Sequence, residues 1–171
     1  MKLRGRFLSF SNTQKNDQIM KVLMVCLGNI CRSPMAEGIM RHKTAKFGSL
    51  WQIDSAGTMG WHKGNPPDKR AIDTARKNGV DISSQRSRQF QTTDFDYFDA
   101  IFVMDASNLQ AVLAMADTPE QRQKVSLLLE KGRVEYPNFE VPDPYYDGRF
   151  QEVFDLIDKA CETIVHDIRN E

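Results

Sequence analysis

The chain has 171 residues, of which 40% are hydrophobic and 27% are charged, a composition typical of one globular domain with room for a core. Its 23 basic residues equal its 23 acidic ones, so the formal net charge of zero argues against nucleic acid or an anionic membrane as a partner. No apolar run approaches the ~18 residues of a membrane span. Three cysteines are too few for a disulfide scaffold, so we expect a protein of the reducing cytoplasm.

The first twenty residues differ from the rest of the chain. A short apolar patch at 7–10 is followed by a polar stretch. The patch is too short for the central region of a signal peptide, and no cleavage site of small residues follows it. We therefore expect residues 1–20 to be a poorly ordered N-terminal extension without an assigned function, and residues 21–171 to form the functional domain.

Strand-like and helix-like segments alternate along the remaining chain. Short apolar runs predict strands, and apolar residues three or four positions apart predict helices. The predicted strands are 21–26, 51–56, 99–104 and 125–129, and the predicted helices run from Pro34 to Gly48, from Asp68 to Gly79, over 107–116 and from Phe150 to Ile168. This alternation predicts an α/β fold in which helices flank both faces of a parallel sheet.

A cysteine, five further residues and an arginine, Cys26 to Arg32, lie between the first strand and the first helix. Gly28 and Asn29 tolerate the left-handed backbone that a tight loop needs. A loop at the start of a helix directs several backbone N–H groups toward one point, which makes an anion site. Arg32 adds a planar fork of donors that matches two phosphate oxygens. The segment therefore predicts a phosphate-binding loop.

Cys26 is the candidate nucleophile of this loop. The surrounding donors favour its thiolate form, and a nucleophile in a phosphate site is typical of a phosphatase with a phosphocysteine intermediate. The pattern Cys-x5-Arg alone is weak, because it also fits a buried cysteine and a surface arginine. Ser33, a predicted N-cap, and Pro34, a predicted first helical residue, place the loop where doubly wound folds bind ligands.

The segment Val25–Pro34 closely resembles the signature of the low-molecular-weight protein tyrosine phosphatases. Four further motifs follow in the family's order, and the resemblance covers roughly residues 21–168. These motifs are Asp54-Ser55-Ala56-Gly57-Thr58, Trp61-His62-x-Gly64-x-Pro66 with Asp68-x-Arg70-Ala71, Val103-Met104-Asp105-x-Ser107-Asn108-Leu109, and Val141-Pro142-Asp143-Pro144-Tyr145. The resemblance implies four parallel strands in a Rossmann-like arrangement, no cofactor, and a phosphotyrosine-containing protein or peptide as substrate.

The resemblance also implies roles for individual residues. Cys26 would attack phosphorus, Arg32 would hold the phosphate oxygens, and Asp143 would be the general acid. By pattern alone, Asp143 is better explained as a solvated loop acid than as a proton donor. The implied phosphate-binding and loop-supporting residues are Leu27, Gly28, Asn29, Ile30, Cys31 and Ser33, the last donating a hydrogen bond to the Cys26 sulfur, and the implied substrate-flanking residues are Trp61, Tyr145 and Tyr146.

The other two cysteines have different surroundings in the sequence. Cys31 lies in the predicted loop, where it can be a small buried side chain, a reversible disulfide partner of Cys26, or both. Cys161 lies on the apolar stripe of the last predicted helix, which favours a core position.

Histidine positions argue against a metal site. His42, His62 and His166 have no ligand spacing among themselves or with the cysteines, so we expect no metal. Animal members of the family place a histidine within the segment that matches 83–86, where it supports the loop asparagine. This chain has none there, so we expect Ser55 or Gln85 to hold Asn29.

Three alternatives use the same scaffold or the same loop. Thioredoxin-coupled arsenate reductases need a further cysteine pair, and residues 62–160 contain no cysteine. Bacterial protein-arginine phosphatases carry threonine where this chain has Ile30. A non-catalytic phosphopeptide-binding module would need neither Cys26 nor Asp143. The sequence therefore favours a tyrosine phosphatase, for which we expect a monomer, although no pattern determines the oligomeric state.

Overall fold

The structure, a computed structural model, describes residues 18–170. Residues 1–17 lie outside this range, and with them most of the predicted N-terminal extension. Met20, which the prediction placed in that extension, is the first residue of the first strand.

Four parallel strands form a single sheet in the order β2-β1-β3-β4. The strands are β1 Met20–Cys26, β2 Trp51–Gly57, β3 Ala100–Val103 and β4 Val125–Leu127. The chain leaves β1 toward β2 on one side, and β3 lies on the other side. The carboxyl ends of β1 and β3 therefore meet at the point where the strand order reverses, which is the usual ligand site of such sheets.

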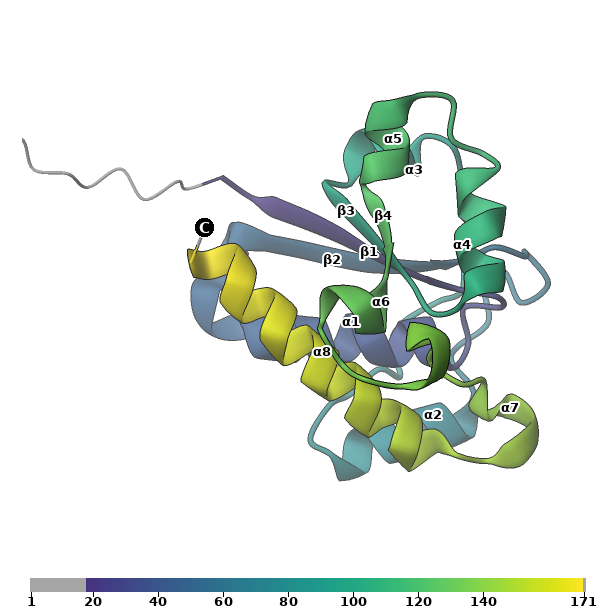
Figure 1. Ribbon diagram of the computed structural model, residues 1–171. Coiled ribbons are helices and arrows are strands. Elements are labelled where there is room, and N and C mark those ends of the chain that lie inside the picture. Colours follow the sequence, from purple (N-terminus) through teal and green to yellow (C-terminus); the bar gives the residue numbers. More distant parts are fainter. Residues whose placement is uncertain (1–17, 171) are drawn as a thin grey trace, which may run out of the picture.

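Helices cover both faces of the sheet, which confirms the predicted α/β fold (Figure 1). α1, α2 and α8 lie on one side of the strands, and α3 and α4 lie on the other. The helices are α1 Arg32–Thr44, α2 Lys69–Lys77, α3 Asp94–Tyr97, α4 Ala106–Leu113, α5 Pro119–Gln123, α6 Leu128–Lys131, α7 Pro144–Asp147 and α8 Phe150–Asn170, with 3-10 turns at Ala45–Leu50 and Pro137–Phe139.

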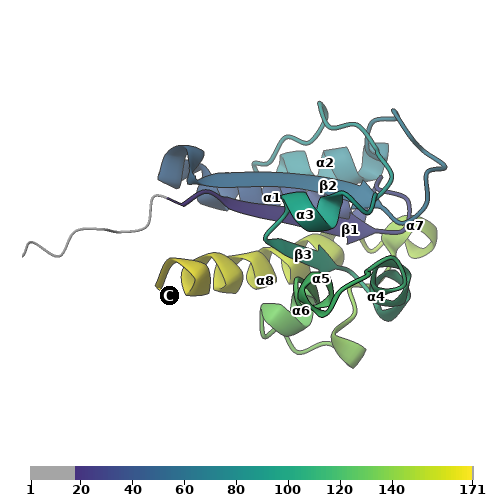
Figure 2. The same ribbon diagram turned by 90° about the horizontal axis from the view of Figure 1, so that it is seen from above.

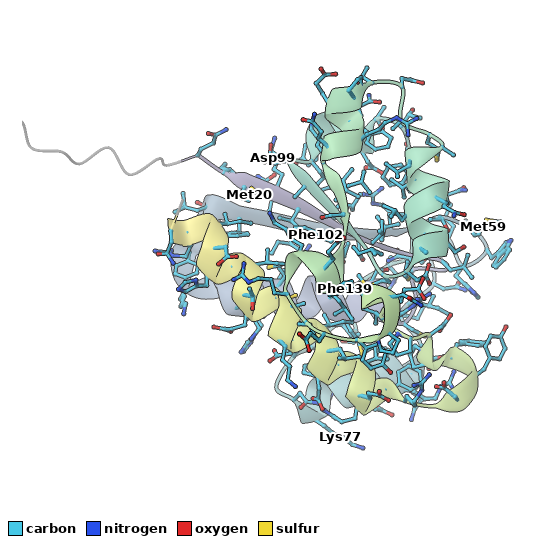
Figure 3. All side chains as sticks on the ribbon, viewed as in Figure 1. Met20, Met59, Lys77, Asp99, Phe102 and Phe139 are labelled. Carbon is cyan, nitrogen blue, oxygen red and sulfur yellow. The ribbon has the colours of Figure 1, made fainter. Side chains whose placement is uncertain are left out.

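The central strand β1 is buried on both faces, which explains its continuous apolar sequence. Val22 and Met24 belong to the core under α1 and α8, whereas Leu23 and Val25 belong to the core under α3 and α4. Phe102 of β3 lies in the middle of the molecule (Figure 3). Packing on both faces therefore fixes the position of β1 and, with it, the point at which the following loop begins.

The boundaries of the first helix differ from the prediction. α1 begins at Arg32, so Ser33 lies inside its first turn and is not the N-cap, which is Cys31. The regular helix ends at Thr44 and continues as a 3-10 turn, in which Gly48 has the left-handed φ of 66°. The short helices α3, α5, α6 and α7 were not predicted, because four or five residues do not display a helical period.

α7 lies at the end of the molecule where β1 stops (Figures 1 and 2). Met59, in the loop after β2, lies at this same end, opposite Met20 at the start of β1 (Figure 3). The loops that follow β1 and β2 therefore share one end of the sheet with α7. Within residues 18–170, no helix is long and apolar enough to cross a membrane.

Candidate active site

The loop between β1 and α1 is held against the loop that follows β2. The backbone N–H of Thr58 donates to the Cys26 carbonyl and that of Met59 donates to the Leu27 carbonyl, both at 2.9 Å. A Cβ on Gly57 would lie 2.8 Å from the Leu27 oxygen, so only glycine permits this approach. The start of the loop, at Cys26 and Leu27, is therefore held by the backbone that follows β2.

The left-handed backbone that the sequence suggested for Gly28 and Asn29 is found at only one of the two residues. Asn29 adopts the left-handed conformation, with φ of 55°. Gly28 does not belong to the positive-φ residues of the structure, so that part of the prediction was wrong. A Cβ at Gly28 would instead lie 3.1 Å from Cδ2 of His62, so glycine makes room for that ring.

Asn29 is the centre of a buried polar network behind the loop. Its Nδ2 donates to the hydroxyls of Ser33 and Ser55, each at 2.9 Å, and its Oδ1 accepts from the backbone N–H of Arg88 at 2.9 Å. Ser55 therefore holds Asn29, which was one of the two residues expected from the sequence to do so. Gln85 donates to the backbone of α1 instead and does not reach Asn29.

The hydroxyl of Ser33 lies 3.0 Å from the sulfur of Cys26. Ser33 accepts from Asn29, so its own hydrogen can point at the sulfur, with the Ala56 carbonyl at 3.4 Å as the more distant acceptor. The predicted contact between Ser33 and Cys26 is therefore present. Both side chains are buried, which strengthens this bond and keeps competing water away.

A buried carboxyl, which the sequence did not single out, extends the network. Ser55 donates to Oε2 of Glu37 at 2.6 Å, and Arg41 pairs with the other oxygen at 2.9 Å. Burial raises the pKa of Glu37 above its usual value. Glu37 takes the hydrogen of Ser55, so the oxygen of Ser55 is left to accept from Asn29.

Arg32 is buried and is surrounded by acceptors. Its Nη1 donates to Oδ2 of Asp105 at 2.6 Å and to the Val141 carbonyl at 3.0 Å, and its Nη2 lies 3.5 Å from Oδ2 of Asp143. Burial alone would lower the pKa of Arg32, but Cys26 and the two carboxylates raise it. The guanidinium therefore stays charged beside the thiol.

Asp105 has a role that the sequence analysis did not assign. Its Oδ1 caps α4 by accepting from the Asn108 N–H at 2.8 Å. Its other oxygen pairs with Arg32. A signal was available, because Asp105 follows a buried strand and the carboxyl ends of neighbouring parallel strands share one edge.

A pocket of about 170 Å³ opens between the loop and α7. Asp143 lines it and caps α7 by accepting from the Tyr145 N–H at 3.1 Å. The rim aromatics are open to solvent, with Trp61 67% and Tyr146 91% exposed. The pocket is lined by Cys26, Leu27, Gly28, Ile30, Cys31, Arg32, Trp61, His62, Asp143, Tyr145 and Tyr146. Of the predicted site residues, Asn29 and Ser33 do not line the pocket and lie behind the loop.

The three cysteines have distinct surroundings. Cys26 and Cys31 both line the pocket, and Cys161 is fully buried in α8. Burial raises the pKa of Cys31, as it does that of Cys161. Cys31 is therefore a protonated neighbour of Cys26, and Cys161 has the predicted core position.

Known proteins were compared with this chain and its structure. Residues 21–171 match the model of the family described as low molecular weight phosphotyrosine protein phosphatase. The low molecular weight protein-tyrosine-phosphatase YfkJ of Bacillus subtilis is 43% identical over 156 residues, which cover 90% of this chain and 98% of YfkJ. A low molecular weight protein-tyrosine-phosphatase of Streptomyces coelicolor is 37% identical over 156 residues, which cover 88% of this chain and 94% of that protein.

Solved structures agree with this match. The crystal structure of Bacillus subtilis YfkJ superposes with a TM-score of 0.83 at 41% identity, covering 90% of this chain and 96% of that one. The crystal structure of DARP, a Drosophila arginine phosphatase, superposes with a TM-score of 0.80 at 35% identity, covering 87% of this chain and 98% of DARP.

Ser55→Ala should destabilise the protein, because it removes one of the two acceptors of Asn29 and one donor to the buried Glu37. We expect the free energy of unfolding, measured by urea denaturation, to fall by about 2 kcal/mol. Ser84→Ala, at an exposed position, is the matched control and should change it by less than about 0.5 kcal/mol. Equal values for the two variants would show that the network behind the loop adds no stability.

Proposed function

Because this chain belongs to the low-molecular-weight phosphotyrosine protein phosphatase family, we propose that it hydrolyses phosphotyrosine in proteins or peptides through a phosphocysteine intermediate. One observation carries the assignment of roles. The Cys26 thiol and the Arg32 guanidinium share one loop, and the Asp143 carboxyl, 111 positions after Arg32, lines the same pocket. These are the three groups that a cysteine-based phosphatase needs: a nucleophile, an oxyanion ligand and a proton donor.

In the first step, Cys26 attacks phosphorus and the bond between phosphorus and the tyrosine oxygen breaks. Arg32 and the backbone N–H groups of residues 27–32 hold the three phosphate oxygens, on which the negative charge is spread. Asp143 gives its proton to the departing phenolate. The product of this step is tyrosine and a phosphate bound to the Cys26 sulfur.

In the second step, water attacks the phosphocysteine. Asp143, now a carboxylate, takes a proton from that water, and Cys26 leaves as a thiolate. The hydroxyl of Ser33, 3.0 Å from the sulfur, stabilises this leaving thiolate, and Asn29 keeps the hydroxyl oriented. Inorganic phosphate then dissociates from the loop.

The rim of the pocket favours an aromatic phosphate ester. Trp61, Tyr145 and Tyr146 offer flat faces for a substrate ring, and rings stack on such faces at centroid distances of roughly 4.5–7 Å. Arg32 neutralises the phosphate, so the chemistry needs no metal, and the same turnover is expected with and without a chelator. We also propose that the protein acts in the cytoplasm, for which its low cysteine count is the support, and that it acts as a monomer.

Phosphoarginine is the second candidate substrate, because DARP superposes closely on this chain. Ile30 lines the pocket where bacterial arginine phosphatases are expected to carry threonine. We therefore expect kcat/KM to be higher for a phosphotyrosine peptide than for the same peptide with phosphoarginine. A higher kcat/KM for the phosphoarginine peptide would instead make phosphoarginine the preferred substrate.

Cys26→Ser should abolish turnover while the protein still folds and binds inorganic phosphate. Serine keeps the shape of the side chain, but only the thiolate is nucleophilic enough at neutral pH, so we expect a loss of more than about 1,000-fold. Acid quenching of the native enzyme during turnover should trap phosphate on Cys26. Appreciable hydrolysis by the serine variant, or an adduct on Cys31, would contradict the mechanism.

Asp143→Asn should slow the first step most for substrates with a poor leaving group. Tyrosine, with a pKa near ~10, needs a proton as it leaves, whereas nitrophenol needs it less. In single-turnover experiments we expect a loss of about 100-fold or more for a phosphotyrosine peptide and a much smaller loss for nitrophenyl phosphate. Similar losses for the two substrates would mean that Asp143 orients the loop and that another group supplies the proton.

A further inference from the structure

The side chain of Arg70, in the first turn of α2, lies between the phosphate-binding loop and α7. Its Nε and Nη2 donate to the two carboxylate oxygens of Asp68 at 3.0 and 2.9 Å, and its Nη1 donates to the Tyr145 carbonyl at 2.9 Å. The guanidinium also lies over the rings of Tyr145 and Phe150, at 5.2 and 4.8 Å. The mechanism given above uses none of these contacts.

One end of this chain of contacts is fixed to the phosphate-binding loop. The backbone N–H of Asp68 donates to the Ile30 carbonyl at 2.8 Å. Asp68 also caps α2, and the hydrogen bond with Arg70 lowers the pKa of its carboxyl, so the ion pair is complete at neutral pH. Arg70 is therefore paired with a residue that is hydrogen-bonded to the phosphate-binding loop.

The other end reaches the segment that carries the general acid. Tyr145 donates its N–H to Asp143 and accepts from Arg70 through its own carbonyl. On the opposite side of Asp143, the Val141 carbonyl accepts from Arg32 and the Val141 N–H donates to Met104 at 2.8 Å. The acid is thus held on both sides, and Arg70 is the contact on the α7 side.

We propose that Arg70 is a positioning residue that couples α7 to the phosphate-binding loop and so places the carboxyl of Asp143 for proton transfer. The inference rests on the proposed role of Asp143. An ordinary surface ion pair between Arg70 and Asp68 would contribute little. A misplacement of the acid by about 1 Å, in contrast, costs about 100-fold in rate.

The test compares Arg70→Gln, Asp143→Asn and the double variant in single-turnover formation of the phosphocysteine. We expect Arg70→Gln to slow the reaction of a phosphotyrosine peptide about 10- to 100-fold and that of nitrophenyl phosphate by less than about threefold. In the Asp143→Asn variant, adding Arg70→Gln should lower the rate of phosphocysteine formation by less than about twofold, because there is no acid left to position. Arg70→Lys, which keeps one donor, should fall between the native enzyme and Arg70→Gln.

Arg149→Gln is the matched control. Arg149 follows the C-terminal end of α7, whereas Asp143 precedes its N-terminal end, and Arg149 pairs with Asp147 and Glu152. It should leave the preference between the two substrates unchanged. Equal losses of Arg70→Gln on both substrates, or independent losses in the double variant, would overturn the inference while leaving the role of Asp143 intact. If Asp143→Asn itself showed no preference between the substrates, the proposed acid would be wrong, and the role of Arg70 would be wrong with it.

Discussion

The buried guanidinium of Arg32 is the contact on which the site depends. A charge away from water costs several kcal/mol unless it is paired and hydrogen-bonded. The fold meets this requirement from three directions, with Asp105 after β3, the Val141 carbonyl before the acid, and Asp143 itself. Because β1 and β3 are neighbours that end at one edge of the sheet, these segments converge at the start of α1. The same guanidinium that gathers them is then available to a phosphate.

Behind the loop, a second set of contacts gives Cys26 its surroundings. Asn29 bridges Ser33 and Ser55 from a left-handed conformation, which asparagine adopts more readily than most other side-chain-bearing residues. The buried Glu37 fixes the direction of the Ser55 hydroxyl. A buried network of hydrogen bonds restrains the loop, which favours backbone N–H groups that are already oriented when a substrate arrives.

The sequence predicted the features that are local. β1 follows from its apolar run, α8 from its apolar stripe, and the loop from the spacing of Cys26 and Arg32. Short elements such as α7 have no period to detect, and Ser33 was misread as a cap because its hydroxyl is used by the sulfur instead. The pairings of Arg32 with Asp105 and of Glu37 with Ser55 join residues 73 and 18 positions apart. Such contacts depend on the order of the strands, which a single sequence does not reveal.

The comparison of Arg32→Lys with Arg32→Ala tests most directly whether the geometry of this guanidinium, and not its charge alone, supports catalysis. Lysine keeps the charge but has one compact head group, which cannot hold Asp105, the Val141 carbonyl and a phosphate together. We therefore expect kcat/KM for a phosphotyrosine peptide to fall for the lysine variant nearly as far as for the alanine variant. A lysine variant that retains most of the native kcat/KM would contradict the account.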